Sequence, residues 1–178
     1  MLSRCPHAYG DHVSRTLILI RHAKSDWSVP AQDRDRPLTH RGLRQAPYVG
    51  EWLAARDLVP RYVAVSPARR AQQTWDLVLE ALAAQGRDVE GIEVHTVEDA
   101  YTFSGDDLLD VVAGIPGDAP MAALVGHNPA MEELVEILTG QDVILKTSAM
   151  AVVETDGPGW TAGGCRLLVA GRPADESL

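Results

Sequence analysis

Four short apolar runs, separated by longer segments with helical periodicity, restrict this chain to few architectures. Each run has the length and the apolar composition of a buried strand. Strands that alternate with helices in this way are typical of a mostly parallel sheet covered by helices, so we predict an α/β fold. The predicted strands are Leu17–Ile20, Tyr62–Val65, Ile92–Val97 and Met121–Val125.

Helical spacing of apolar residues predicts a helix over Ala68–Ala84 and another over Met131–Leu138. Thr39 is suited to cap a third helix that runs to Leu53, and Ser104 is suited to cap a fourth. Each predicted helix therefore lies between two predicted strands or directly after one, as a layered α/β domain requires.

The remaining segments define the limits of the predicted domain. Ala149–Val169 has the pattern of two strands joined through Asp156-Gly157-Pro158-Gly159, which predicts an antiparallel hairpin at a sheet edge. Residues 1–15 lack periodicity and predict a loose N-terminal extension, and residues 171–178 predict a C-terminal tail. A single domain is expected between them, over residues 16–170.

Composition limits the location and the partners of the chain. No apolar run approaches the ~20 residues that cross a bilayer, and the first sixteen residues lack a secretory signal, so we expect a cytoplasmic protein with no membrane partner. Cys5 and Cys165 are too few for a disulfide framework. The net charge of −9 argues against non-specific binding of nucleic acid.

The charge is unevenly distributed along the chain. Residues 1–75 hold 12 Lys and Arg against 6 Asp and Glu, whereas residues 76–178 hold 4 against 19. A basic segment in an acidic protein predicts a local anion site, although the same arginines could instead pair with the acidic part of the chain.

Polar residues follow three of the predicted strands at the point where each ends. Arg21 and His22 follow the first strand, Ser66 the second and His127 the fourth. Because ligands of open α/β sheets bind beyond the carboxyl ends of the strands, we expect these residues to meet there, together with Arg70.

This set of side chains has the chemistry of a phosphate site. Arginine presents a planar fork of donors to phosphate oxygens, and a neutral imidazole such as that of His22 can attack phosphorus directly. Nearby arginines lower the pKa of the imidazole and favour that neutral form. A protonated His127 could donate to the phosphoryl oxygens, and Lys24 and Ser66 are lesser candidates for contact with them.

A zinc site is the main rival interpretation of paired histidines. A fixed cation at Arg21 would repel a divalent ion at His22, and the chain has no HExxH or CxxC pattern, so we predict neither a metal nor another cofactor. Either histidine could also be structural, since Gly126-His127-Asn128-Pro129 resembles an ordinary turn. The other histidines lack a matching strand end and are His7, His12, His40 and His95.

Four motifs in order resemble the histidine phosphatase superfamily, most closely its small phosphohistidine phosphatases of the SixA type. The resemblance spans about residues 16 to 156. It implies a three-layer α/β sandwich with a mostly parallel central sheet. The motifs are Leu17-Ile18-Leu19-Ile20-Arg21-His22-Ala23-Lys24, Arg36-Pro37-Leu38-Thr39-His40-Arg41-Gly42, Ser66-Pro67-Ala68-Arg69-Arg70-Ala71-Gln72-Gln73-Thr74 and Val125-Gly126-His127-Asn128.

The resemblance also implies roles for single residues. His22 becomes the nucleophile that accepts the phosphoryl group, with Arg21, Arg70 and His127 around the phosphate. The motif places its arginine after three intervening residues, which selects Arg70 and leaves Arg69 facing solvent.

Departures from the larger family members bear on the substrate. Phosphoglycerate mutases and acid phosphatases carry insertions that close over the substrate and supply a carboxylic proton donor, and this chain is too short for such a lid. Glu98 or Asp99 could be the donor, or both could be solvated loop acids. Trp27 could line the rim of the site or pack under a loop.

A site with a poor acid suits phosphohistidine, which leaves as imidazole from a labile P–N bond. We therefore predict a metal-independent phosphatase that acts through a covalent phosphohistidine on His22, with a phosphorylated protein as its substrate. The alternatives are a small-molecule phosphomonoesterase and an inactive phosphate-binding module.

Overall fold

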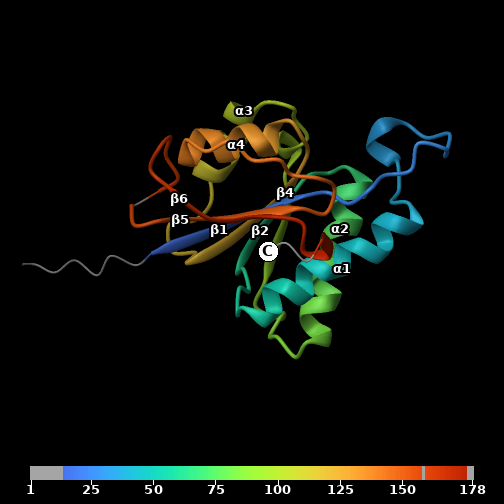
Figure 1. Ribbon diagram of the computed structural model, residues 1–178, viewed down its shortest axis with the longest axis horizontal. Helices are drawn as coiled ribbons and strands as arrows, with labels where there is room; N and C mark the ends of the chain where they lie inside the picture. The colour runs from blue at the N-terminus through green and yellow to red at the C-terminus, as the bar shows by residue number, and fades with distance from the viewer. Residues whose placement is uncertain (1–13, 158, 176–178) are drawn as a thin grey trace, which may run out of the picture.

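A six-stranded sheet lies between two pairs of helices within residues 14–157 and 159–175, which the computed structural model describes (Figure 1). The predicted three-layer α/β fold is confirmed. The strands are β1 (Arg15–Arg21), β2 (Tyr62–Val65), β3 (Glu93–Thr96), β4 (Met121–Gly126), β5 (Met150–Thr155) and β6 (Arg166–Gly171). The helices are α1 (His40–Ala55), α2 (Arg69–Ala84), α3 (Gly105–Ala113) and α4 (Ala130–Thr139), with 3-10 turns η1 (Asp33–Asp35), η2 (Glu98–Ala100) and η3 (Pro173–Asp175).

The sheet has the strand order β3-β2-β4-β1-β5-β6, so that β4 lies between the first two strands of the chain. β1, β2, β3 and β4 are parallel to their neighbours in this set, whereas β5 is antiparallel to β1 and to β6. Arg21 pairs with Gly126 and Val65 pairs with Val125. The carboxyl ends of β1, β2 and β4 therefore reach the same edge of the sheet.

Each face of the sheet is covered by one helix pair. In β1, Leu17 and Leu19 belong to the core under α3 and α4, whereas Ile18 and Ile20 belong to the core under α1 and α2 (Figure 1). All four side chains are fully buried. A continuous apolar run is expected for a strand that is covered on both faces, which explains the composition of this segment.

α1 and α3 begin at the N-capping residues that the sequence predicts. The Thr39 hydroxyl accepts a hydrogen bond from the Gly42 amide at 3.1 Å, and the Ser104 hydroxyl accepts one from the Asp107 amide at 3.4 Å. These bonds satisfy amide groups that the first turn of a helix leaves without intrahelical partners. The predicted antiparallel hairpin at the sheet edge is also confirmed, as β5 and β6.

The described strands run from Arg15, where β1 begins, to Gly171, where β6 ends. Most of the predicted N-terminal extension, including Cys5, lies outside the described residues. Cys165 is a half-buried free thiol. No helix in the described ranges is long and apolar enough to cross a membrane.

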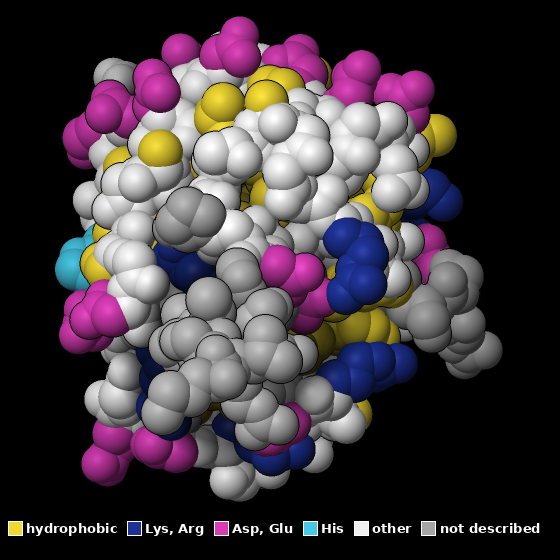
Figure 2. All heavy atoms as spheres, turned by 90° about the vertical axis from the view of Figure 1, so that its left-hand side faces the viewer, with side chains coloured by type: hydrophobic (Ala, Val, Ile, Leu, Met, Phe, Trp, Pro, Cys, Tyr) yellow, Lys and Arg dark blue, Asp and Glu magenta, His cyan; other side chains and the backbone are white. Residues whose placement is uncertain are grey.

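The face at which β1 begins lies opposite the strand ends discussed above. Figure 2 shows that acidic side chains gather along the top of this face, where α3 and α4 lie in Figure 1. Part of the charge of the acidic second half of the chain thus lies away from the carboxyl ends of the strands.

Candidate active site

The candidate site lies beyond the carboxyl ends of β1 and β4, where the connections leave on opposite faces of the sheet. β1 leads to α1 on one face and neighbouring β4 leads to α4 on the other, which opens a crevice between the two strand ends (Figure 1). A cavity of about 240 Å³ occupies this place. Among the residues that line it are Arg21, His22, Lys24, Arg70 and His127.

His22 is held in one tautomer. Its Nδ1 lies 2.7 Å from the carbonyl oxygen of Ala23, and its Nε2 lies 3.3 Å from Nε of Arg70. A carbonyl can only accept and a guanidinium can only donate, so Nδ1 carries the proton and Nε2 carries a lone pair. His22 as a whole residue is 9% exposed. The lone pair that could attack phosphorus therefore faces the guanidinium that would bind phosphate.

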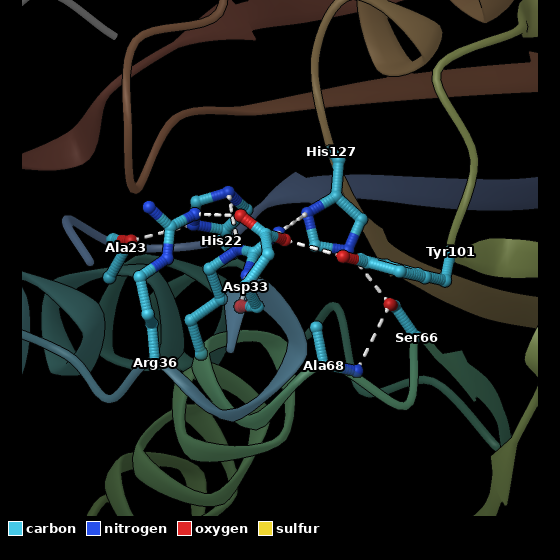
Figure 3. A network of polar contacts seen from close by, with 9 residues as sticks. His22, Ala23, Asp33, Arg36, Ser66, Ala68, Tyr101 and His127 are labelled. Atoms are coloured by element: carbon cyan, nitrogen blue, oxygen red, sulfur yellow. Dashed lines mark hydrogen bonds and ion pairs between the residues drawn. The ribbon is translucent and has the colours of Figure 1, made fainter. Parts of the chain in front are cut away.

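The same reasoning assigns the tautomer of His127. Nη2 of Arg70 lies 3.3 Å from Nδ1 of His127, so Nδ1 accepts. Nε2 of the neutral ring then donates to the Ser66 hydroxyl at 2.7 Å (Figure 3). The ring centroids of His22 and His127 are 4.9 Å apart. Ser66 thus acts on the site through His127.

Both imidazoles are neutral at physiological pH. Burial, supported by Arg70 and Arg21 and opposed by the hydrogen bond to Ala23, lowers the pKa of His22 to about 4. Burial, supported by His22 and Arg70, lowers the pKa of His127 to about 3. The arginines act in the predicted direction, but desolvation is the larger cause. A phosphoryl dianion beside His127 would raise its pKa again, because an opposite charge favours imidazolium.

The sequence matches the histidine phosphatase superfamily (branch 1) over residues 17–95. An uncharacterized protein of Mycobacterium tuberculosis is 31% identical over 156 residues, which cover 88% of this chain and 90% of that relative. The chain belongs to the histidine phosphatase superfamily. Membership supports hydrolase chemistry for the pocket around His22.

Solved structures of the superfamily share the fold of this chain. A protein assigned as the phosphohistidine phosphatase SixA from Agrobacterium tumefaciens is 27% identical with a TM-score of 0.75, over 89% of this chain and 98% of that one. Its counterpart from Nakamurella multipartitia is 31% identical with a TM-score of 0.71, over 90% of this chain and 96% of that one. The similarity therefore extends over nearly the whole of both proteins.

Arg21 and Lys24 lie on the β1 side of the pocket. Nη1 of Arg21 donates to the carbonyl of Leu145 at 2.6 Å, while its Nε is buried without a partner among the described residues. Burial lowers the pKa of Arg21, although Glu132 opposes this shift. Lys24 is exposed at the mouth, and its carbonyl accepts from the Thr39 amide at 2.8 Å. This side of the pocket thus has one partly buried and one exposed cation.

Several residues at the site were not assigned a role from the sequence. Asp33, Arg36 and Tyr101 come from the β1–α1 connection and from the segment after η2, and Figure 3 shows them around His22 and His127. Arg36 opens one of the four family motifs, so this motif was a signal that could have identified it. Nothing in the local sequence marks Asp33 or Tyr101, because their contact joins residues 68 positions apart.

Glu98 and Asp99, the proposed proton donors, lie outside the histidine pocket. Both line a second cavity of about 620 Å³ beside α3. The Glu98 carboxylate accepts two hydrogen bonds from the Arg34 guanidinium, at 2.7 and 3.0 Å. A role in proton donation therefore stays a prediction for either residue.

Two exposed aromatic side chains flank the pocket. Trp27 is 74% exposed and Phe103 is 61% exposed, and both line the cavity. The guanidinium of Arg36 lies 3.3 Å from the centroid of the Trp27 ring.

Arg69 is exposed and Arg70 is buried, in the orientations that the family motif predicts. No group of three potential metal ligands occurs among the described residues.

Proposed function

We propose that this chain is a metal-independent phosphatase that transfers a phosphoryl group to Nε2 of His22 and then to water, with phosphohistidine in proteins as its substrate. The observation that carries the proposal is the fixed tautomer of His22, whose unprotonated Nε2 points at Arg70. Its pKa of about 4 keeps this nitrogen nucleophilic at neutral pH.

The reaction follows from the donors around this nitrogen. Nε2 attacks phosphorus as the bond to the leaving group breaks, and the phosphorylated ring becomes positively charged. The Ala23 carbonyl, which accepts from Nδ1–H, stabilises that charge. Arg21, Arg70 and His127 stabilise the charge on the phosphoryl oxygens. Water then attacks phosphorus, releases inorganic phosphate and restores neutral His22.

The acid–base chemistry of the pocket supports a phosphoramidate substrate. Asp33 is the one carboxylate that lines the pocket among the described residues. Burial raises the pKa of Asp33, but hydrogen bonds from Tyr101 and Arg70 outweigh it, so this pKa is below the usual value. An ionised carboxylate cannot protonate an alkoxide, whereas phosphohistidine loses an imidazole, which is a far better leaving group.

The mouth of the pocket supports a substrate on a protein surface. The exposed rings of Trp27 and Phe103 lie at its rim, where they can stack on the imidazole of the substrate or contact neighbouring side chains. The names of the two SixA structures point to the same substrate class.

The decisive experiment measures phosphate release from a phosphohistidine-bearing protein and from an aryl phosphate, with a chelator present. His22→Ala should lower the rate about a thousandfold or more on both substrates. His95→Ala is the matched control, because His95 lies on strand β3 and does not line the pocket. Alkaline quenching should trap acid-labile phosphate on the wild-type protein and none on His22→Ala.

Faster release from the phosphohistidine substrate would support the proposed substrate. Faster release from the aryl phosphate would retain the mechanism and assign a small phosphomonoester instead. If neither substrate gives His22-dependent release, the chain is a phosphate-binding module. Loss of activity in chelator would contradict metal independence.

A further inference from the structure

The Asp33 carboxylate sits between two arginine side chains of the pocket. Oδ2 accepts from Nη2 of Arg70 at 3.0 Å, and Oδ1 accepts from Nη2 of Arg36. The hydroxyl of Tyr101 also donates to Oδ2 (Figure 3). Three donors from α2, from the β1–α1 connection and from the segment after η2 thus converge on one carboxylate.

Every nitrogen of the Arg70 guanidinium already has an acceptor within the protein. Nε donates to His22, Nη1 donates to the backbone carbonyl of Asp33 at 2.6 Å, and Nη2 donates to the carboxylate of Asp33 and to His127. A phosphoryl group on Nε2 of His22 takes the lone pair that now faces Nε of Arg70, and its oxygens then compete with the other acceptors of this guanidinium for the same donors.

The guanidinium of Arg36, in contrast, has nitrogens without an acceptor in the described part of the chain. Its side chain is 7% exposed, and its Nε and Nη1 are buried without a hydrogen-bond partner among the described residues. The charges that line the pocket are four cations, of Arg21, Lys24, Arg36 and Arg70, against the single anion of Asp33. The pocket thus has donors and positive charge for a further anion.

A carboxylate and a phosphoryl group offer the same pairs of oxygen atoms to a guanidinium. We propose that Asp33 is an internal competitor for the substrate, whose carboxylate binds Arg70 and Arg36 and is exchanged for the entering phosphoryl group. This inference rests on the proposed function, because it assumes that the phosphoryl group enters the pocket of His22. Asp33 thereby sets how tightly the site holds phosphate.

The local structure permits this exchange. The side chain of Asp33 is 45% exposed and belongs to a 3-10 turn of three residues, so its carboxylate can rotate into water. The backbone carbonyl of Asp33 keeps its bond to Nη1 of Arg70 when the side chain leaves. Arg70 therefore stays aligned while Nη2 becomes available to the phosphoryl oxygens. The returning carboxylate then favours release of inorganic phosphate.

Calorimetric titration with inorganic phosphate tests the proposal without turnover. Asp33→Asn removes the competing charge with little change in shape, and phosphate should bind about tenfold more tightly than to the wild type. Asp35→Asn is the matched control, because it removes a charge from the same turn at a residue that does not line the pocket. Its affinity should stay within about twofold of the wild type.

Kinetics provide the second measurement. In Asp33→Asn, the inhibition constant for inorganic phosphate and the KM should fall together, a change that general loss of structure cannot produce. Equal or weaker phosphate binding by a variant with wild-type thermal unfolding would overturn the proposal, and so would an equal gain in Asp35→Asn. Failure of the proposed function would appear separately, as turnover that does not depend on His22.

Discussion

Thr74 connects the backbone beneath His22 to the helix that carries Arg70. Its hydroxyl accepts from the Ala23 amide at 2.9 Å and donates to the Arg70 carbonyl at 2.6 Å, and its side chain is fully buried. The carbonyl of the same Ala23 fixes the tautomer of His22. One hydroxyl thus fixes the relative positions of Arg70 and of His22, the proposed nucleophile.

Replacing Thr74 with Val should uncouple these two residues. The buried Ala23 amide loses its acceptor, which should lower the free energy of unfolding by about 1–3 kcal/mol. Displacement of His22 relative to Arg70 should also lower kcat about tenfold, because misplaced reacting groups lose rate. Urea unfolding and phosphatase assays measure the two effects. Thr74→Ser should restore both, and a Val variant with wild-type kcat would contradict the coupling.

The site residues whose position could be predicted from the sequence are those that directly follow an apolar strand. His22, Ser66 and His127 follow β1, β2 and β4, and parallel pairing brings these strand ends to one edge. Asp33 and Tyr101 lie in connections without periodicity. Their positions depend on how two connections fold over the pocket, which no local pattern encodes.

At the scale of elements, α1 and α2 pack through a glycine in the middle of α1. A Cβ added at Gly50 would lie 2.4 Å from the Val78 carbonyl oxygen and 2.7 Å from the Ala81 Cβ. Glycine is unfavourable inside an isolated helix, so helix propensity alone makes Gly50 an unexpected residue in the interior of α1. The close approach of α2 is the physical reason for its presence.

Gly50→Ala should therefore destabilise the protein despite the better helix propensity of alanine. We expect the free energy of unfolding to fall by about 1–3 kcal/mol, because the helices must separate to admit the methyl group. Gly117→Ala is the control, since an added Cβ there meets no atom within 4 Å. Its effect should stay within about 0.5 kcal/mol. Thermal unfolding followed by circular dichroism compares them, and equal effects would contradict the packing argument.

The sequence predicted most elements but not their order in the sheet. Apolar runs and caps were sufficient for β2, whose bounds match the prediction, and for the start of α1. The insertion of β4 between β1 and β2 could not be predicted from periodicity, because β1, β2 and β4 are all apolar runs that are buried on both faces.

At the scale of the whole molecule, the two buried histidines make stability depend on pH. The pKa of His22 falls from 6.5 to about 4 on folding, and that of His127 falls to about 3. The unfolded chain therefore binds more protons than the native protein below about pH 6.5, and acidification favours unfolding. For His22 alone the loss should reach about 3 kcal/mol near pH 4.

Urea unfolding at pH 7, 6 and 5 tests this prediction. The wild type should lose stability steadily over this range, whereas a His22→Asn/His127→Asn double variant should show a much flatter dependence. The difference between the two proteins isolates the histidines from the carboxylates that titrate in both. Parallel curves would show that the native histidines are not held neutral.

The central position of β4 has a consequence for synthesis on the ribosome. β1 and β2 do not pair with each other; each pairs with β4, which ends at residue 126 of the 178. Until that strand emerges, β1 has no partner strand among the described residues, and the sheet does not connect it to the pair of β2 and β3. The proposed phosphate site can therefore assemble only after β4 has been synthesised, and a polypeptide released before His127 carries His22 without the other half of its pocket.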